Sequence, residues 1–454
     1  MRRVLFGIGL YFFCINGYGQ SDSAFIAKIA SEVFRHSTAY SNLHELTKSI
    51  GPRLSGSPQT YAAEQWGIKT LRAAGADTVY LQSCMIPHWV RGKKEQVTLI
   101  QGQKKIPLQA IALGNSVGTS KEGIKAPVIL IHNFDELEQR KDEIRGKIVF
   151  YNYPMNPDFV NTLFAYFDAV PYRGYGASRA AKYGAVGMVV RSMSESVDNN
   201  PHTGAMRYND SFPKIPALAL GLRDADKLAA AIEKNPSTSL YLFSGAYRLP
   251  DTTGYNVIAE WRGTEFPDQY ITVGGHLDSW DPAEGAQDDG AGCVHSIEVL
   301  RALKAAGYKP RHTIRVVLFT DEENGGSGGN QYAAVAAANN EKHIFALESD
   351  GGGFTPRAFT VSANPAQLAT LRSWAPLLSP YGISEILNMG GGADVDPLYA
   401  TRQIPVGELI PDTQRYFDYH HSAGDVFEVV NKRELELGAI TMAALIFLTD
   451  KYGL

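Results

Sequence analysis

The feature that most narrows the possible folds of this chain is an almost continuously apolar run, HTIRVVLFT, at 312–320. A strand with one face in water alternates polar and apolar residues, so an unbroken apolar run predicts a strand covered on both faces. QYITVGG (269–275) predicts a second strand, and 290–307 predicts a helix between the two. Apolar residues recur at helical spacing in that helix, at Val294, Ile297, Leu300 and Leu303. Strands and helices therefore alternate in this part of the chain.

The alternation extends over the rest of the second half of the sequence. Residues 343–349 and 404–409 predict two more strands, and 433–450 predict a final helix. An earlier helix begins at Ser57-Pro58 and ends at Gly75, with a capping serine, a proline in the first turn and a glycine after the end. This order of elements predicts a layered α/β fold, in which functional residues gather at the carboxyl ends of the strands.

The middle of the chain has a different sequence pattern, with predicted strands but no cluster of candidate ligands. Because 454 residues exceed one ordinary core, we expect two domains. Strands are predicted at 126–132, 146–152 and 213–220, and a helix followed by a strand at 175–192, without any cluster of candidate ligands. We therefore expect 118–248 to form an inserted accessory domain, and 20–117 with 249–454 to form the main domain.

Polar clusters follow the predicted strands of the main domain. They supply His276 and Asp278 in GGHLDSWD, Asp288 and Asp289 in AQDDGAG, Asp321, Glu322 and Glu323 in TDEENGG, Glu348 and Asp350 in ESDGGG, and His420, His421 and Asp425 in YHHSAGD. Any single cluster is explained by a helix cap or a solvated loop. Together they fall at the carboxyl edge of one predicted sheet, which indicates a shared site.

The residue types of these clusters favour a metal site. Carboxylates packed together repel one another and raise each other's pKa unless cations neutralise them. Apart from Cys14, the chain has only Cys84 and Cys293, so a thiolate site is not expected. Imidazole and carboxylate ligands suit zinc, whereas a site with only oxygen ligands would favour magnesium or calcium. Two zinc ions that share one bridging carboxylate would use five protein ligands.

The ordered motifs resemble the di-zinc exopeptidases of the aminopeptidase and glutamate carboxypeptidase group. The motifs are IPHWVRG (86–92), NPHTGAMRY (200–208), PKIPAL (213–218), GGHLDSWD (274–281), AQDDGAG (286–292), DEENGG (321–326), ESDGG (348–352) and HHSAGD (420–425). The resemblance covers nearly the whole chain after residue 19. It implies a layered α/β/α zinc-peptidase domain with a central mixed sheet, plus an inserted protease-associated-type domain.

The resemblance also implies a role for each matching residue. His276 and Asp350 would hold one zinc, Glu323 and His421 the other, Asp288 would bridge the two ions, Glu322 would be the general base, and Asp278 would hydrogen-bond His276 and fix its tautomer. The peptide bond between Asp288 and Asp289 is expected to be cis, with Asp289 facing away from the metals.

Other residues near these motifs have open roles. Glu348 competes with Asp350 as a ligand, although motif position favours Asp350. His420 is expected to pack beside His421 or to act behind the ligands. Asp394 lies in a Gly-rich segment that either lines the substrate pocket or forms a plain turn. The tyrosine and arginine of VPYRGYG (170–176) are candidates to reach the cleft from the insert.

The N-terminus predicts export. Arg2 and Arg3 precede an apolar run at 4–15, and the small residues Gly17 and Gly19 suggest cleavage near Gly19, giving a secreted or periplasmic protein. The run is too short to span a bilayer comfortably, so no membrane anchor is expected. With 43 basic and 47 acidic residues, the chain lacks the basic excess of a nucleic-acid-binding protein. The oligomeric state is open, a homodimer included.

The expected function is that of a zinc exopeptidase that cleaves dipeptides or the terminal residues of short peptides. Two alternatives remain: a receptor-like binding protein on the same fold, which would typically have lost metal ligands, and a glutaminyl cyclase that uses one zinc. The filled ligand positions and the candidate base argue against both. The sequence leaves open whether the amino or the carboxyl end of the peptide is recognised.

Overall fold

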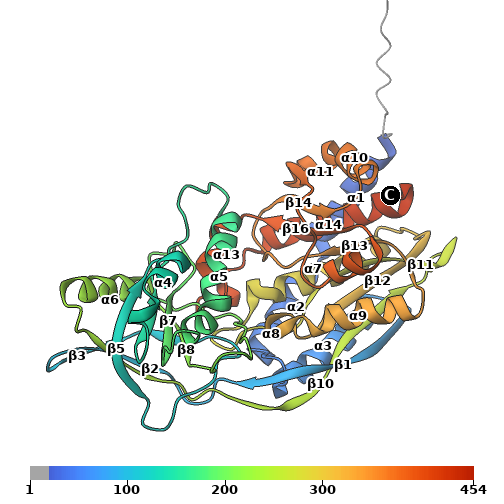
Figure 1. Cartoon of the computed structure of the whole chain (residues 1–454). Coiled ribbons are helices and arrows are strands. Elements are labelled where there is room, and N and C mark those ends of the chain that lie inside the picture. Colours follow the sequence, from blue (N-terminus) through green and yellow to red (C-terminus); the bar gives the residue numbers. More distant parts are fainter. Residues whose placement is uncertain (1–19) are drawn as a thin grey trace, which may run out of the picture.

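The computed structural model of the protein describes residues 20–454, and the predicted export signal at 1–19 lies outside them. Two eight-stranded sheets form the framework (Figure 1). The strands of the first sheet are β1 (Thr78–Val90), β10 (Tyr247–Trp261), β11 (Phe266–His276), β12 (His312–Phe319), β13 (Lys342–Glu348), β14 (Pro356–Ser362), β15 (Glu385–Leu387) and β16 (Val406–Pro411). The strands of the second sheet are β2 (Gln96–Gln101), β3 (Lys104–Leu108), β4 (Ala110–Ala112), β5 (Ile124–Ile131), β6 (Ile148–Tyr151), β7 (Gly187–Arg191), β8 (Ala217–Leu220) and β9 (Ser239–Phe243).

Helices cover both faces of the first sheet. They are α1 (Gln20–His36), α2 (Ala39–His44), α3 (Pro58–Ala73), α7 (Ala291–Ala305), α8 (Glu322–Gly325), α9 (Ser327–Ala338), α10 (Pro365–Ser373), α11 (Ala375–Leu378), α12 (Asp396–Arg402) and α14 (Lys432–Tyr452). α13 (Thr413–Tyr419) instead packs with the core of the second sheet through Tyr416 and Phe417. Apolar residues of α1, α3, α7 and α14 share one core with the sheet, and α9 and α12 share another. The predicted α/β/α layering is confirmed.

The central strands of the first sheet are parallel. β12, β11, β13 and β16 lie side by side in parallel, β10 runs antiparallel to both β1 and β12, and β14 runs antiparallel to β16 but parallel to β15, so the sheet is mixed as expected. Every residue of β12 is buried, which agrees with its continuous apolar run. In the pairing register, His276 of β11 lies beside Phe319 of β12, and Gly274 lies beside Glu348 of β13. The carboxyl ends of three strands therefore meet at one edge.

The second sheet begins earlier in the chain than predicted. β2, β3 and β4 lie before residue 118, yet β2 pairs with β9 and β4 pairs with β8, so all three belong to the second sheet. The expected start at 118 is therefore too late, because short strands carry no local signal that tells which sheet they will join. The helices α4 (Phe134–Gln139), α5 (Thr162–Ala181) and α6 (Leu222–Lys234) pack on this sheet.

Two long strands connect the parts of the molecule. β1 leaves the first sheet and β10 returns to it, and the two pair antiparallel from Thr78 and Glu260 to Val90 and Tyr247. Among residues 20–454, no helix has both the length and the apolar character needed to cross a membrane.

The close packing of α3 on the sheet generates a stability prediction. A Cβ on Gly67 would lie 2.8 Å from Leu318 Cδ1 on β12. We expect Gly67→Val to lower the free energy of unfolding by about 1–3 kcal/mol through overpacking. Gly174→Ala in α5 is the control, because a Cβ there meets no atom within 4 Å; it should stabilise the protein by up to about 1 kcal/mol. Urea unfolding midpoints measure both, and equal midpoints would contradict close packing at Gly67.

Candidate metal centre

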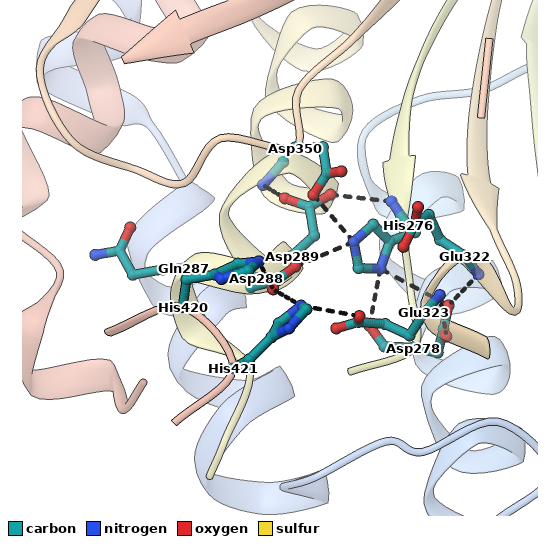
Figure 2. A network of polar contacts seen from close by, with 12 residues as sticks. His276, Asp278, Gln287, Asp288, Asp289, Glu322, Glu323, Asp350, His420 and His421 are labelled. Atoms are coloured by element: carbon teal, nitrogen blue, oxygen red, sulfur yellow. Dashed lines mark hydrogen bonds and ion pairs between the residues drawn. The ribbon is translucent and has the colours of Figure 1, made fainter. Parts of the chain in front are cut away.

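Five side chains converge at the carboxyl edge of the first sheet (Figure 2). His276 Nε2 lies 3.0 Å from Asp350 Oδ1 and 3.2 Å from Asp288 Oδ1. On the other side, His421 Nε2 lies 3.1 Å from Asp288 Oδ2 and 3.1 Å from Glu323 Oε2. Each oxygen of Asp288 thus faces a different imidazole. The five predicted ligands form two groups that share one carboxylate.

Different elements bring these side chains to the edge. His276 is the last residue of β11, and Glu323 lies in the first turn of α8, directly after β12. Asp350 follows β13, and Asp288 lies in the segment before α7. His421 follows α13 and adopts a left-handed backbone with φ of 61°. The site therefore depends on three adjacent strands and on two segments that only the fold brings near them.

Backbone carbonyls orient both imidazoles. Nδ1 of His276 lies 3.0 Å from the carbonyl oxygen of Asp278, and Nδ1 of His421 lies 3.3 Å from that of Thr203. A carbonyl only accepts hydrogen bonds, so Nδ1 of His276 carries the proton, whereas Nδ1 of His421 also lies 3.4 Å from Arg173 Nη1, which only donates. The Nε2 of each ring points at the carboxylates, where it can bind a metal ion once it has lost its proton.

Asp278 acts differently from the prediction. Its carboxylate Oδ1 lies 3.7 Å from His276 Nδ1, and its backbone oxygen makes the hydrogen bond instead. The carboxylate accepts hydrogen bonds from the backbone N–H of Glu322 at 3.1 Å, the N–H of Glu323 at 3.3 Å and the hydroxyl of Ser55 at 3.0 Å. Asp278 therefore fixes His276 through its main chain and the glutamate pair through its side chain.

The peptide bond that joins Asp288 to Asp289 has the predicted conformation. Their peptide bond is cis. Asp289 accepts hydrogen bonds from the N–H of His276 and the N–H of Gly292, both at 2.9 Å, and so faces away from the paired imidazoles. A side chain on Gly292 could not fit, since its Cβ would lie 1.8 Å from the carbonyl oxygen of Ser349.

Several carboxyl groups are buried close together in this site. Burial raises the pKa of Asp350, and it raises the pKa of Glu323 to about 7. Although burial disfavours a charged imidazole, the Asp350 carboxylate holds the pKa of His276 well above its ordinary value. Oε1 of Glu323 has no hydrogen-bond partner among residues 20–454. A set of carboxylates that attracts protons onto its imidazoles and leaves a buried oxygen unpaired suits divalent cations, and the mixed nitrogen and oxygen donors suit zinc.

The structure also places the residues whose roles were open. Oε2 of Glu348 accepts the backbone N–H groups of Asp394 and Val395 at 2.9 and 3.0 Å, whereas Asp350 contacts His276, so the geometry favours Asp350 as ligand. Asp394 is fully buried, which excludes a plain surface turn.

His420 lies beside the ligand group. Its ring stacks on that of His421 with centroids 3.5 Å apart, and its Nε2 is 3.7 Å from Asp288 Oδ2. Among residues 20–454, two groups of residues are compact enough to hold an ion: His420, His421 and Asp288 form one, and His276, Asp288 and Asp350 form the other.

Some contacts of the site were not predicted. Thr203 lies within NPHTGAMRY and Asp425 within HHSAGD, but no role was assigned to either. Arg53 and Trp280 were also missed, although Trp280 packs edge-on against His421 with centroids 5.9 Å apart. The motifs contained most of these residues, yet backbone contacts leave no local pattern that would identify their roles.

Comparisons with known proteins found a family model and several similar proteins. The model of peptidase family M28 matches residues 256–446, which include all five candidate ligands. Carboxypeptidase Q from Homo sapiens is 36% identical over 410 residues, covering 90% of this chain and 84% of that protein. A peptidase M28 precursor from Shewanella amazonensis has a TM-score of 0.90 at 32% identity, covering 95% of this chain and 97% of that chain. A zinc aminopeptidase from Bacillus subtilis shares the fold, with a TM-score of 0.65 at 20% identity over 90% of this chain and 94% of that chain.

Zinc binding is the direct test of the site. We expect metal-free protein to take up two zinc ions per chain, and zinc at 100 times its dissociation constant to stabilise it by about 2.7 kcal/mol. Asp288→Asn should lose most of this stabilisation because a neutral amide cannot serve both halves. Elemental analysis and thermal unfolding with and without zinc measure the effect. Asp251→Asn, at an exposed carboxylate that pairs with Arg248, is the control. Uptake of a single zinc, or unchanged zinc stabilisation in Asp288→Asn, would contradict a shared carboxylate.

Proposed function

Since the chain belongs to peptidase family M28 and is a zinc-dependent exopeptidase, we propose that it uses two zinc ions to hydrolyse dipeptides or short peptides after export from the cytoplasm. The observation that supports two metals is the placement of Asp288, whose two oxygens face His276 and His421 at 3.2 and 3.1 Å. Export rests on the sequence of residues 1–19.

The residues present fit two zinc ions. His276 and Asp350 would hold one, His421 and Glu323 the other, and Asp288 would contact both. When bound, zinc lowers the pKa of a water molecule and polarises the carbonyl of the scissile peptide bond. The imidazoles are already oriented for this task by the carbonyls of Asp278 and Thr203.

Glu322 is the proposed general base. Its backbone N–H donates to Asp278 Oδ1 at 3.1 Å, which anchors the start of α8 beside the ligands. Burial raises the pKa of Glu322 well above its ordinary value, so this carboxylate holds a proton more readily than an exposed one, as a general base requires. Its carboxylate would accept a proton from the attacking water. The hydroxyl adds to the carbonyl carbon, the C–N bond breaks, and Glu322 returns the proton to the leaving amine.

The two alternative functions are less well supported. Membership of a peptidase family and five filled ligand positions argue against a receptor-like protein. A single-zinc glutaminyl cyclase would not need a carboxylate placed between two imidazoles. Metal stoichiometry separates the cyclase from the proposed peptidase.

Arg173 bears on which end of the peptide is recognised. It lies on α5 and is buried, with Nη1 3.4 Å from His421 Nδ1 and Nη2 donating to the Tyr166 hydroxyl at 2.7 Å. Its Nη1 also lies 3.4 Å from the carbonyl oxygen of Thr203, but among residues 20–454 no carboxylate forms a salt bridge with it and its Nε has no hydrogen-bond partner. A buried cation without an anion is costly, and a substrate carboxylate would compensate for it. We therefore favour substrates with a free carboxyl end, in agreement with the name of the relative carboxypeptidase Q.

The two adjacent glutamates should separate catalysis from metal binding. Glu322→Gln should keep its zinc while kcat falls at least ~100-fold, as expected for a lost general base. Glu323→Gln should instead weaken zinc binding, because it removes a ligand charge. Steady-state kinetics on a dipeptide with parallel zinc analysis measures both variants. The reverse pattern would show that the roles of the two glutamates are exchanged.

Recognition of the carboxyl end can be tested with amidated substrates. Arg173→Gln should raise KM for peptides with a free carboxylate by ~10-fold or more, since a charge-assisted hydrogen bond contributes about 1.5–3 kcal/mol. Amidated peptides should already be poor substrates of the unchanged enzyme, and the substitution should affect them little. Arg179→Gln is the control, because Arg179 lies on the same helix but is exposed and stacks on Phe134. Equal hydrolysis of free and amidated peptides by the unchanged enzyme would refute this role.

A further inference from the structure

One carboxylate binds the backbone of the segment that carries the bridging residue. Asp425 Oδ1 accepts the N–H of Ala286 at 3.1 Å and the N–H of Gln287 at 2.6 Å. Its Oδ2 accepts the N–H of Asp288 at 3.1 Å. The side chain of Asp425 is buried, so water does not replace these bonds freely. Three consecutive amides up to and including Asp288 are thus held by a single residue.

The carbonyl groups of the same segment are held from the opposite side. Arg53 is fully buried, and its guanidinium donates to the carbonyl oxygens of Glu284 at 2.6 Å and Gly285 at 3.0 Å. Its Nε donates to the carbonyl of Leu277 at 2.7 Å, in the segment that follows His276. Gly285 adopts a left-handed backbone with φ of 60°, which turns its carbonyl toward Arg53 at little cost for a residue without Cβ.

Asp425 also links two ligand-bearing segments. It follows His421 in the motif HHSAGD, and its N–H donates to the carbonyl of Ser422 at 3.2 Å. Its own carbonyl accepts the N–H of Glu284 at 3.1 Å. Through its side chain and main chain, Asp425 therefore ties the segment of His421 to the segment of Asp288. These two ligands neither end one of the three adjacent strands nor come within a few residues of its carboxyl end.

We propose that Asp425 is a positioning residue that holds Asp288 at the place where its carboxylate serves both imidazoles. The proposal rests on the proposed two-metal function, but it concerns zinc affinity and metal geometry rather than turnover. Its physical reason is that a three-residue segment with free amides could rotate, and the Asp288 carboxylate would then face only one of the two imidazoles. Loss of Asp425 would also leave three buried N–H groups without acceptors.

Two substitutions of Asp425 remove different numbers of its hydrogen-bond acceptors. Asp425→Asn is nearly isosteric and keeps an amide oxygen for the N–H groups of Ala286 and Gln287, but its NH₂ group cannot accept the N–H of Asp288. Asp425→Ala removes all three acceptors. The matched control is Asp450→Asn. Asp450 is also fully buried and accepts the N–H groups of Arg311 and His312, both at 2.8 Å, near the start of β12 and away from the ligand edge.

The experiment measures zinc affinity by competition with a chelator, the visible spectrum of the cobalt-substituted protein, and the unfolding midpoint without metal. We expect Asp425→Ala to lose about 10–100-fold in zinc affinity, as is usual for residues behind metal ligands, and to change the cobalt spectrum. Asp425→Asn should fall between this variant and the unchanged protein. Asp450→Asn should lower the unfolding midpoint while its zinc affinity and cobalt spectrum stay unchanged.

The outcomes separate a positioning role from a structural one. If both Asp425 variants lose unfolding midpoint but keep zinc affinity and the cobalt spectrum, Asp425 only stabilises the fold and the proposal is wrong. If Asp425→Ala fails to fold, Asp425→Asn still decides by the same two readouts. An unchanged protein that binds two zinc ions but cleaves no peptide would contradict the proposed function, while the zinc and cobalt measurements would still decide the role of Asp425.

Discussion

The electrostatic cost of gathering carboxylates in a buried place is the constraint on which the rest of the structure depends. Asp288, Glu323 and Asp350 lie within contact distance of two imidazoles, and Glu322 lies beside them. Such a group is stable only if cations or protons balance its charge. Divalent metal ions would supply that balance and the chemistry together, which is why a site of this composition points to function more strongly than any of its residues alone.

The two sheets, each with its connecting segments, contribute to this site in different ways. All five candidate ligands come from the first sheet and its connections. The segment that includes Thr203 connects strands of the second sheet, and the carbonyl of Thr203 orients His421. Trp280 packs against both His421 and Trp89, with ring centroids 5.9 and 6.2 Å away. The second sheet and its connections thus support the candidate metal site without providing a ligand. Arg173 of α5 also brings a positive charge next to His421.

Part of this architecture could be predicted because it is written in local patterns. The apolar run of β12 and the helical spacing in α7 require particular environments, so the α/β layers followed from them. The start of the second sheet could not be predicted, since β2 and β4 are short and their partners β9 and β8 lie more than a hundred positions away. Likewise, the order of elements did not indicate that β1 and β10 would pair over their whole lengths.

The sequence by itself determined which residue types reach the carboxyl edge and therefore which chemistry the site can support. The predicted strands placed His276, Glu323 and Asp350 close to strand ends, and the resemblance of the motifs to zinc exopeptidases selected these three together with Asp288 and His421 as candidate ligands. Only the tertiary structure decided how the site is held. Asp278 acts on His276 through its carbonyl and on the glutamates through its carboxylate, and Asp425 holds three amides of a distant segment. Backbone groups are the same in every residue, so no pattern of letters can show which of them a buried carboxylate will bind until the chain has folded.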